Sequence, residues 1–458
     1  MERGAKLFLC GSLAVLMVGC VTGPSADSRT PPPEVVCRPP CKVVIDHGTR
    51  WEPAVAINPR EPNNIVAVSM NQGLDQAGAR YSLPLAHASA DGGLSWTTAS
   101  LPMGAAAGGQ HPLAGYNHAD DPTATFLADG TLVVAALTFT YVAAQGRAVF
   151  IAPAAISLWR SNDGGRSFPD AQVAFAGKGN VFPGSPDGYT ENDKQWLAPD
   201  SDGGLLMAWN QNTRGTPACP QECTRLIVSW SQDKGRSWSE PLVVHSGISS
   251  GAFPLVLDDG RWVVSYRDTE RATIHVAASR DQGATWTTND SIDFTTKFPV
   301  LAKVGDGERI YMAYPRAAEK RGQPEVPQVV AIRWSDDGGD TWSLATDIAT
   351  SSAPARTSPA LATIGDTAIV TFWHPQESNG ELGATLTAVA VASRGSASHR
   401  LILDSHEGTT RTTGDYMGLA SFGEGNAAYA VWNARHGNAH HITGARLSLG
   451  ASGSIIAG

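Results

Sequence analysis

The chain has 458 residues, a net charge of −9 and no basic run, which argues against nucleic acid and an anionic membrane surface as partners. Its 48 glycines and 29 prolines favour a fold with many turns, and no long helical periodicity is present. Length alone would allow about three domains, but an internal repeat would place most residues in one closed body.

The chain begins with an export signal. Arg3 and Lys6 precede the apolar run 7–18, which is too short to span a membrane as a mature helix. We therefore predict a signal peptide over residues 1–19.

The end of this run, Gly19-Cys20, looks like a bacterial lipobox, in which cleavage would leave Cys20 as the lipidated first residue. The alternative is an ordinary secretory signal with an incidental cysteine. Val21, the residue after this cysteine, resembles those found at the same position in lipoproteins that are sorted to the outer membrane. We expect an exported protein, lipid-anchored to the bacterial cell envelope at the outer membrane, with the lipid as its only membrane contact.

Residues 20–42 form the lipidated cysteine and a tether that contains three consecutive prolines, 31–33. This stretch lacks the apolar residues that build a core and is predicted to be stiff and solvated.

Four cysteines remain outside the signal and form two Cys-x-x-x-Cys pairs, Cys37 with Cys41 and Cys219 with Cys223. In an exported protein, each pair is a candidate for a disulfide that closes a small loop. A zinc site of four cysteines is the alternative, disfavoured by the oxidising compartment and the three-residue spacing. The histidines show no metal-ligand spacing, so we predict no metal.

One eight-residue pattern, Ser-x-Asp-x-Gly-x-[Ser/Thr]-aromatic, recurs along the chain. Five copies are nearly intact and a worn sixth copy starts at residue 393; the intact copies are Ser89–Trp96, Ser161–Phe168, Ser231–Trp238, Ser279–Trp286 and Ser335–Trp342. Each copy predicts a hairpin turn, because Asp can accept backbone N–H bonds and Gly can take a positive φ. We interpret these boxes as structural and not catalytic.

The six starts are 48 to 72 residues apart, which fits one four-stranded antiparallel sheet per unit. A single sheet of this kind cannot bury both faces, and radial stacking protects the strand edges. We therefore predict an all-β, six-bladed β-propeller over residues 43–449, followed by a tail over residues 450–458.

The boxes, together with Trp51-Glu52-Pro53 near the start and Gly414-Asp415-Tyr416 near the end, resemble the bacterial BNR or Asp-box repeat proteins of the sialidase-like superfamily. The resemblance covers nearly the whole mature chain. It implies a site near the propeller axis where three arginines clamp a substrate carboxylate, a tyrosine attacks the sugar, and an aspartate acts as acid and base.

Carried over residue by residue, the resemblance implies catalytic roles for Tyr416 and Asp75. It implies carboxylate-binding roles for Arg50, Arg267 and either Arg316 or Arg321. Each of these residues also has a structural alternative, as an ion-pair partner, a turn residue or a packing residue.

One departure from the family pattern concerns the glutamate that activates the tyrosine. The stretch 249–255, where it is expected, contains no acid, and a tyrosine of ordinary pKa is a poor nucleophile without a partner. Asp415 or Glu191 is a candidate substitute.

Two further polar clusters precede predicted strands, His118-Ala-Asp120-Asp121-Pro122 and Glu191-Asn-Asp193-Lys194-Gln-Trp196. They are expected at strand starts, where the loops of a propeller converge on one mouth of the channel. They would either line the pocket or join neighbouring blades by hydrogen bonds.

Two functions are consistent with these observations. The first is an exo-acting glycoside hydrolase of the sialidase type, acting on terminal sialic acid or a related acidic sugar of glycans. The second is a non-catalytic cell-surface propeller that binds a glycan or a protein. Neither requires a cofactor, and we expect a monomer.

Overall fold

The computed structural model describes residues 35–36, 41–48, 50–74, 80–144, 147–179, 188–216, 219–290, 292–305, 307–317, 328–351, 359–378, 381–392, 395–407, 414–423, 426–436 and 439–458. These residues form β-strands and one short 3-10 helix, η1 (Ala105–Ala107). Among them, no helix has the length and apolarity that crossing a bilayer requires.

The strands build consecutive four-stranded antiparallel sheets, which we call blades and number in chain order. Blades 1 and 2 share one hydrogen-bonded path, joined only by a parallel pairing of Ser82 with His118. From the inside outward, blade 1 comprises β3 (Arg50–Ile57), β4 (Ile65–Leu74), β5 (Arg80–Ser89) and β6 (Thr97–Ser100). Blade 2 comprises β7 (His118–Phe126), β8 (Leu132–Ala144), β9 (Arg147–Ser161) and β10 (Asp170–Phe175).

The middle of the chain continues the same pattern. Blade 3 comprises β12 (Tyr189–Pro199), β13 (Leu205–Thr216), β14 (Cys219–Ser231) and β15 (Leu242–Ser246), with the short β11 (Lys178–Gly179) beside β12. Blade 4 comprises β16 (Ser249–Val256), β17 (Trp262–Asp268), β18 (Thr273–Ser279) and β19 (Thr287–Asn289). Blade 5 comprises β20 (Val300–Lys303), β21 (Ile310–Ala317), β22 (Gln328–Ser335) and β23 (Thr346–Ser351).

The last two blades incorporate strands from both ends of the chain. Blade 6 comprises β24 (Ala360–Ile364), β25 (Thr367–Ser378), β26 (Glu381–Val391) and β27 (Ala397–Glu407), with β1 (Val35–Val36) parallel to β27. Blade 7 comprises β28 (Gly418–Ser421), β29 (Ala427–His436) and β30 (Ala439–Leu449), and β2 (Val43–Asp46) and β31 (Ile455–Ala457) both pair with the outer side of β30.

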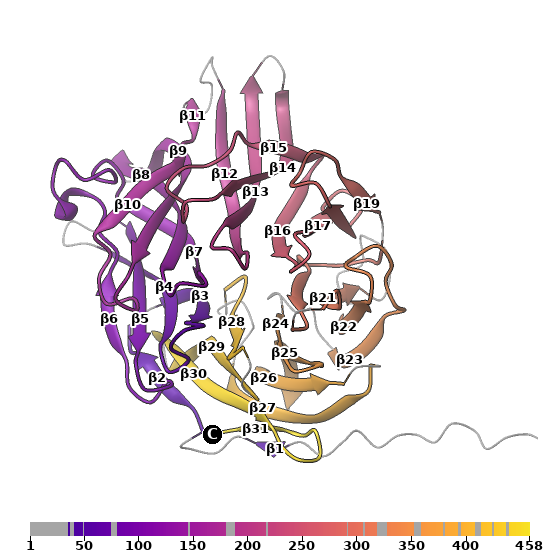
Figure 1. The fold of residues 1–458 in the computed structure, drawn as a ribbon. Coiled ribbons are helices and arrows are strands. Elements are labelled where there is room, and N and C mark those ends of the chain that lie inside the picture. The colour runs from indigo at the N-terminus through magenta and orange to yellow at the C-terminus, as the bar shows by residue number, and fades with distance from the viewer. Residues whose placement is uncertain are drawn as a thin grey trace, which may run out of the picture.

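The innermost strands of successive blades contact one another around a closed ring, in the order β3, β7, β12, β16, β20, β24, β28 and back to β3. Figure 1 shows the blades arranged around a central axis. The fold is therefore a sialidase-like β-propeller, as the repeat predicts.

The ring has seven blades, so the prediction of six is wrong. The described hydrophobic residues form seven core clusters, and each cluster lies between two consecutive blades, including one between blade 7 and blade 1. The sequence count followed the Asp-boxes, and the turn of blade 7 has none. That turn is closed instead by a backbone hydrogen bond from Gly450 to Ser454, 2.8 Å.

The ring closes through strands from opposite ends of the chain. Residues 43–46 pair with β30 of the C-terminal blade, so the first and last segments share one sheet. Residues 450–458, assigned to a tail from the sequence, contain β31, which is part of this blade. Pairing both ends of the chain within one blade stabilises the closed ring, because loss of either strand would expose a sheet edge.

Each Asp-box forms a turn held by its own side chains, as box 3 illustrates. The Oγ of Ser231 accepts the Gly235 N–H at 2.8 Å and donates to Asp233 Oδ1 at 2.8 Å. Asp233 also accepts the Ser237 N–H at 2.7 Å and the Ser237 hydroxyl at 2.6 Å. Burial alone would raise the pKa of Asp233, but these hydrogen bonds lower it to about 2.

We expect Asp233→Ala to lower the free energy of unfolding by about 1–2 kcal/mol, because one backbone and two hydroxyl donors lose a charged acceptor in an exposed turn. Urea unfolding of the variant at neutral pH measures this loss, with Asp202→Ala, an exposed aspartate outside the boxes, as the control. Equal stability of the two variants would contradict a stabilising role for the box carboxylate.

The Asp-box turns also join neighbouring blades. The buried Arg160 of blade 2 donates to the carbonyls of Lys234, at 2.8 Å, and Gly235, at 2.5 Å, in box 3. The same kind of contact recurs at other boxes: Tyr429 donates to Gly93, Asn64 to Gly164, and Arg261 to Asp337. The boxes thus stabilise the outer ring, and they lie away from the axis.

Candidate active site

A β-bulge recurs at the start of the innermost strand in blades 1 to 4. The pairing register breaks between Trp51 and Ala54, Asp120 and Thr123, Asp193 and Trp196, and Ser250 and Phe253. The residue inside each break has a positive φ: Glu52 at 50°, Asp121 at 53°, Lys194 at 52° and Gly251 at 68°. Non-glycine residues rarely adopt this conformation, and such strain concentrates at functional sites.

The bulges bring charged side chains from different blades together at one mouth of the axis. Lys194 Nζ lies 2.9 Å from both carboxylate oxygens of Asp121 and 3.2 Å from Asp415 Oδ2. Lys297 Nζ lies 2.7 Å from Asp415 Oδ1. We call the set Glu52, Asp120, Asp121, Asp193, Lys194, Lys297, Asp415 and Tyr416 the axial cluster.

Burial disfavours ionisation of the Glu52 carboxyl. Burial raises the pKa of its carboxyl well above the ordinary value, and the neighbouring Asp121 raises this pKa further, by its charge and by a hydrogen bond. In that hydrogen bond the protonated Glu52 donates to the Asp121 carboxylate. The nearby Lys194 opposes the shift and does not cancel it.

Asp415 has the opposite character. Burial alone would raise its pKa, but Lys194 and Lys297 hold the pKa of this carboxyl below its ordinary value. Its side chain is 38% exposed, the most open of the ion-paired carboxylates in the cluster. The site therefore contains one carboxyl group whose pKa is raised and one whose pKa is lowered, an arrangement that suits acid–base chemistry.

Two more carboxyl groups complete the cluster. Burial raises the pKa of Asp193 to about 6. Burial also raises the pKa of Asp120, and the Ser82 hydroxyl donates to Asp120 at 2.8 Å. The two polar clusters noted in the sequence thus contact each other and join blades 2 and 3, since Lys194 and Gln195 of β12 bond to Asp121 of β7.

Tyr416 lies buried beneath the charged groups, 2% exposed. Its hydroxyl donates to the Pro122 carbonyl at 3.3 Å, and its ring packs edge-on against Trp196, 5.1 Å between centroids. Burial, followed by the charges of Asp121 and Glu52, raises the pKa of Tyr416 well above its ordinary value. The phenol is therefore neutral in this arrangement.

The arginines expected to form a clamp are engaged elsewhere. Arg50 lies against Asp46, 3.0 Å, and Asn71, 2.5 Å. Arg267 donates to the Thr295 carbonyl at 3.1 Å. Arg316 pairs with Asp293 at 3.4 Å and Asp347 at 3.3 Å. None of these contacts involves the axial cluster.

The remaining sequence candidates have varied placements. Asp75, Arg321, Cys20 and Cys37 lie outside the described residues. Glu191 lies in β12, three residues before Lys194. The charged groups nearest in effect to Tyr416 are Asp121, Glu52, Asp120 and Asp415, and Glu52 is the one for which the sequence predicts no role. The sequence contains a pattern that indicates this residue: an acid followed by proline occurs at equivalent points of two innermost strands, as Glu52-Pro53 and as Asp121-Pro122.

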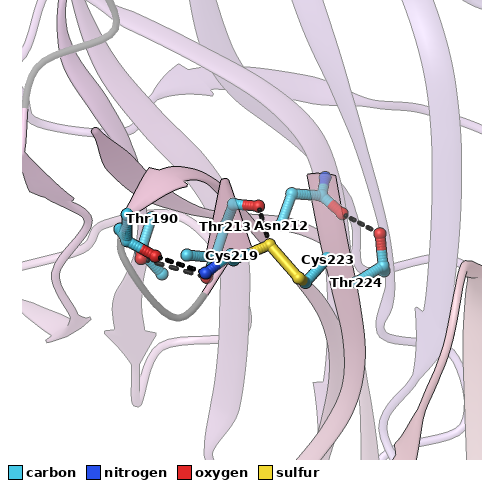
Figure 2. Close-up of a disulfide and its surroundings, with 7 residues drawn as sticks. Thr190, Asn212, Thr213, Cys219, Cys223 and Thr224 are labelled. Carbon is cyan, nitrogen blue, oxygen red and sulfur yellow. Dashed lines mark hydrogen bonds between the residues drawn. A yellow bond between two sulfur atoms is a disulfide. The ribbon is translucent and has the colours of Figure 1, made fainter. Parts of the chain in front are cut away.

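Cys219 and Cys223 form a disulfide at the tip of the β13–β14 hairpin, S–S 1.96 Å (Figure 2). The Thr213 carbonyl lies 3.1 Å from Cys219 Sγ, and Thr224 donates to Asn212 at 3.0 Å beside the bridge. Cys41 is disulfide-bonded as well. Cysteines bonded to each other do not serve as zinc ligands, and no group of three or more potential metal ligands occurs in the part of the chain that the structure describes.

Comparison with known proteins identifies the repeat. A BNR repeat-like domain model matches residues 137–367, half of the chain. No curated protein matches the sequence. A protein of unknown function from Dyadobacter fermentans shares 17% identity with a TM-score of 0.50, over 89% of this chain and 97% of that one.

Two enzymes are also similar in structure, at lower scores. The NanB sialidase of Streptococcus pneumoniae is 11% identical, with a TM-score of 0.49, over 88% of this chain and 93% of that one. An α-L-arabinofuranosidase of Fusarium graminearum is 12% identical, with a TM-score of 0.47, over 89% and 98%. At these identities the likeness concerns the fold alone. The chain belongs to the BNR repeat-like domain family and has a sialidase-like propeller fold.

Proposed function

We propose that this protein is a glycoside hydrolase of the bacterial cell envelope that acts at the axial mouth, with Glu52 as proton donor. Asp415 is the carboxylate that either attacks the sugar or activates water. The observation that carries the proposal is the pairing of an acid held protonated with a nearby carboxylate held ionised. Glycoside hydrolysis uses two carboxyl groups in these states.

The proposed step moves one proton and one glycosyl group. The Glu52 carboxyl gives its proton to the glycosidic oxygen as the bond from that oxygen to the anomeric carbon breaks. The Asp415 carboxylate, or a water that it deprotonates, forms the new bond to the anomeric carbon. Lys194 and Lys297 keep Asp415 ionised for this role, since both ammonium groups lie within 3.2 Å of it.

The tyrosine mechanism of the sialidase resemblance is an alternative at the same site. Tyr416 lies near Asp121, the carboxylate that would accept its proton in that mechanism, although the neutral, carbonyl-bonded phenol disfavours nucleophilic attack. Replacing Tyr416 by Phe separates the two mechanisms. The carboxylate mechanism predicts activity within a few-fold of wild type, whereas the tyrosine mechanism predicts its loss.

A panel of fluorogenic glycosides tests the function. The purified mature protein is assayed with neutral, amino and sialic acid glycosides of 4-methylumbelliferone. Release from any of them that Glu52→Gln removes would support the proposal. Absence of release from the whole panel would reject it.

A non-catalytic glycan-binding propeller is the second candidate. It is favoured by the closed ion-pair chain from Asp121 through Lys194 and Asp415 to Lys297, in which each charge already has a partner. It predicts binding of an oligosaccharide without turnover.

The envelope location is part of the proposal and depends on Cys20. Partition of the wild-type protein into a detergent phase, and of Cys20→Ala into the aqueous phase, is the expected result.

The rate should depend on pH through Glu52 and Asp415. The groups that face Glu52 are Asp121, Lys194 and Asp415. Because the pKa of Glu52 is raised, its proton is present at neutral pH, and kcat/KM should fall only as the pH rises past that raised value. The pKa of Asp415 lies below its ordinary value of 3.8. On the acid side, kcat/KM should therefore begin to fall only below pH 3.8.

A kcat/KM profile between pH 3 and 10 measures both limbs. A profile with its optimum confined to acid pH, falling already between pH 4 and 5 as for an ordinary glutamic acid, would contradict the assignment of Glu52 as the donor.

A further inference from the structure

Gly414 lies directly against the proposed acid. A Cβ placed on this glycine would lie 3.2 Å from Glu52 Cγ and 3.4 Å from the Glu52 backbone nitrogen. Carbon atoms in optimal contact are about 3.5–4.0 Å apart, so a side chain at position 414 would press on the Glu52 side chain. Glu52 belongs to blade 1, whereas residue 414 precedes blade 7. The glycine therefore permits segments from opposite ends of the chain to approach each other at the axial mouth.

The backbone of Gly414 has a second feature that a side chain opposes. Its φ is 78°, in the left-handed region that residues with a Cβ rarely adopt. The next residue is Asp415, whose carboxylate lies 2.7 Å from Lys297 Nζ and 3.2 Å from Lys194 Nζ. Because consecutive Cα atoms are about 3.8 Å apart, a shift of the backbone at residue 414 also moves Asp415. One glycine thus governs the approach of both proposed catalytic carboxyl groups.

Asn433 of blade 7 holds the strand that carries Glu52. Its Nδ2 donates to the carbonyl of Arg50 at 2.5 Å, and Arg50 lies two residues before Glu52 in β3. A Cβ on Gly414 would lie 3.7 Å from Asn433 Oδ1. The side-chain position of residue 414 is therefore close to both Asn433 and Glu52.

The stability of the fold does not by itself account for Asn433. The residue is 2% exposed, and its Oδ1 has no hydrogen-bond partner among the described residues. A buried acceptor without a donor destabilises the folded state, whereas an apolar residue of similar volume has no such cost. Locally unfavourable arrangements of this kind are concentrated at functional sites. This cost agrees with a role for Asn433 in holding β3 beside the proposed acid.

We propose that Gly414 is a positioning residue that sets the places of Glu52 and Asp415 relative to each other, and that Asn433 supports it by fixing β3 from blade 7. This inference rests on the proposed function, because it concerns the same two carboxyl groups. Neither Gly414 nor Asn433 takes part in a chemical step, since both act through Glu52 and Asp415.

Hydrolysis by Gly414→Ala tests the placement of the acid. The variant should keep the wild-type KM and lose about 10- to 100-fold in kcat, since a displacement of about 1 Å can cost about 100-fold. The loss should be larger for methyl glycosides than for 4-methylumbelliferyl glycosides, because a poor leaving group depends most on a well-placed acid. A residue with only a structural role would affect both substrates equally.

Three further variants separate the contact from backbone strain. Gly453 has a φ of 74°, and a Cβ placed on it meets no atom of the described residues within 4 Å. Gly453→Ala therefore has the strain without the contact and should keep the wild-type kcat. Asparagine tolerates the left-handed region better than alanine, so Gly414→Asn should be more stable than Gly414→Ala and still show the larger loss with the methyl glycoside. Asn433→Leu, which removes the bond to β3, should show the same dependence on the leaving group.

A stability measurement tests the placement of Asp415 without any substrate. A double-mutant cycle of Lys297→Met and Asp415→Asn, measured by urea unfolding at pH 7, gives the coupling between these two side chains. This coupling should fall by about half or more when the cycle is repeated in the Gly414→Ala protein, since Asp415 is then displaced from the ammonium group. In the Gly453→Ala protein the coupling should stay at its wild-type value.

The results separate this inference from the proposed hydrolase. Wild-type kcat in Gly414→Ala, an equal loss with both leaving groups, or the same loss in Gly453→Ala would each overturn the positioning role and leave the hydrolase in place. If the wild type hydrolyses no glycoside, the hydrolase is rejected and the coupling decides the role of Gly414. A reduced coupling in Gly414→Ala would then support the placement of Asp415 by this glycine, and an unchanged coupling would overturn it.

Discussion

Glu52→Gln is expected to lower kcat/KM for glycoside hydrolysis by about 100- to 10,000-fold, the range that a positioned general acid contributes. Glutamine keeps the size of the side chain and can donate to Asp121 as the protonated glutamate does, so the fold should be retained. It cannot give a proton to the leaving oxygen. Substrates with a more acidic leaving group should therefore be less affected than those with an alcohol leaving group.

The measurement is a comparison of 4-methylumbelliferyl and methyl glycosides of the preferred sugar, with wild type and variant at neutral pH. Glu240→Gln, an exposed glutamate in the segment that follows box 3, is the matched control and should keep the wild-type rate. If Glu52→Gln hydrolysed both substrates at the wild-type rate, Glu52 would not be the proton donor. Asp415→Asn should also lose activity, independently of the leaving group.

Lys194→Met is expected to lower the free energy of unfolding by about 3–5 kcal/mol, the cost of leaving a buried charge without its partner. Its side chain is 15% exposed, and its ammonium group lies within 3.2 Å of two carboxylates, Asp121 and Asp415. Removing it leaves these acids and Glu52 facing one another at the axis. Asp121 belongs to blade 2 and Asp415 precedes the first strand of blade 7, so the repulsion between their charges acts directly on ring closure.

Urea unfolding at pH 7 measures this loss, with Lys303→Met as the control. Lys303 pairs with Asp258 at 2.7 Å, but the two side chains are 36% and 28% exposed, and a surface pair of this kind contributes about 0–1 kcal/mol. The cost of Lys194→Met should shrink at acid pH, where the facing carboxyls gain protons. An equally small loss in both lysine variants would show that the axial charges do not hold the blades together.

The two expected results also distinguish the roles of neighbouring groups. Glu52 is protonated, so its replacement by an amide changes chemistry and little else. Lys194 is charged and shared by two blades, so its replacement changes stability first. In this proposal Glu52 serves catalysis and the nearby Lys194 serves ring closure. Both residues have a positive φ, 50° and 52°, and such backbone strain is typical of functional sites.

The features that could be predicted from the amino-acid sequence are those whose interactions are local. An Asp-box is complete within eight residues, because its serine and aspartate bond to atoms two to four positions away. The repeat of such turns therefore predicts hairpins, and hairpins that cannot bury both faces alone predict a propeller. The bond between Cys219 and Cys223 has the same local origin.

The number of blades and the composition of the site could not be predicted from the sequence and became visible only in the folded chain. The seventh blade lacks a box and is made partly from residues 43–46, whose pairing with β30 crosses almost the whole chain. The axial cluster joins residues 52, 121 and 194, which lie in equivalent bulges of three blades, with Lys297 and Asp415, which lie between strands. Such contacts depend on ring closure, which no local pattern encodes, and so the proposed catalytic role rests on a cluster of acids and lysines in place of an arginine clamp.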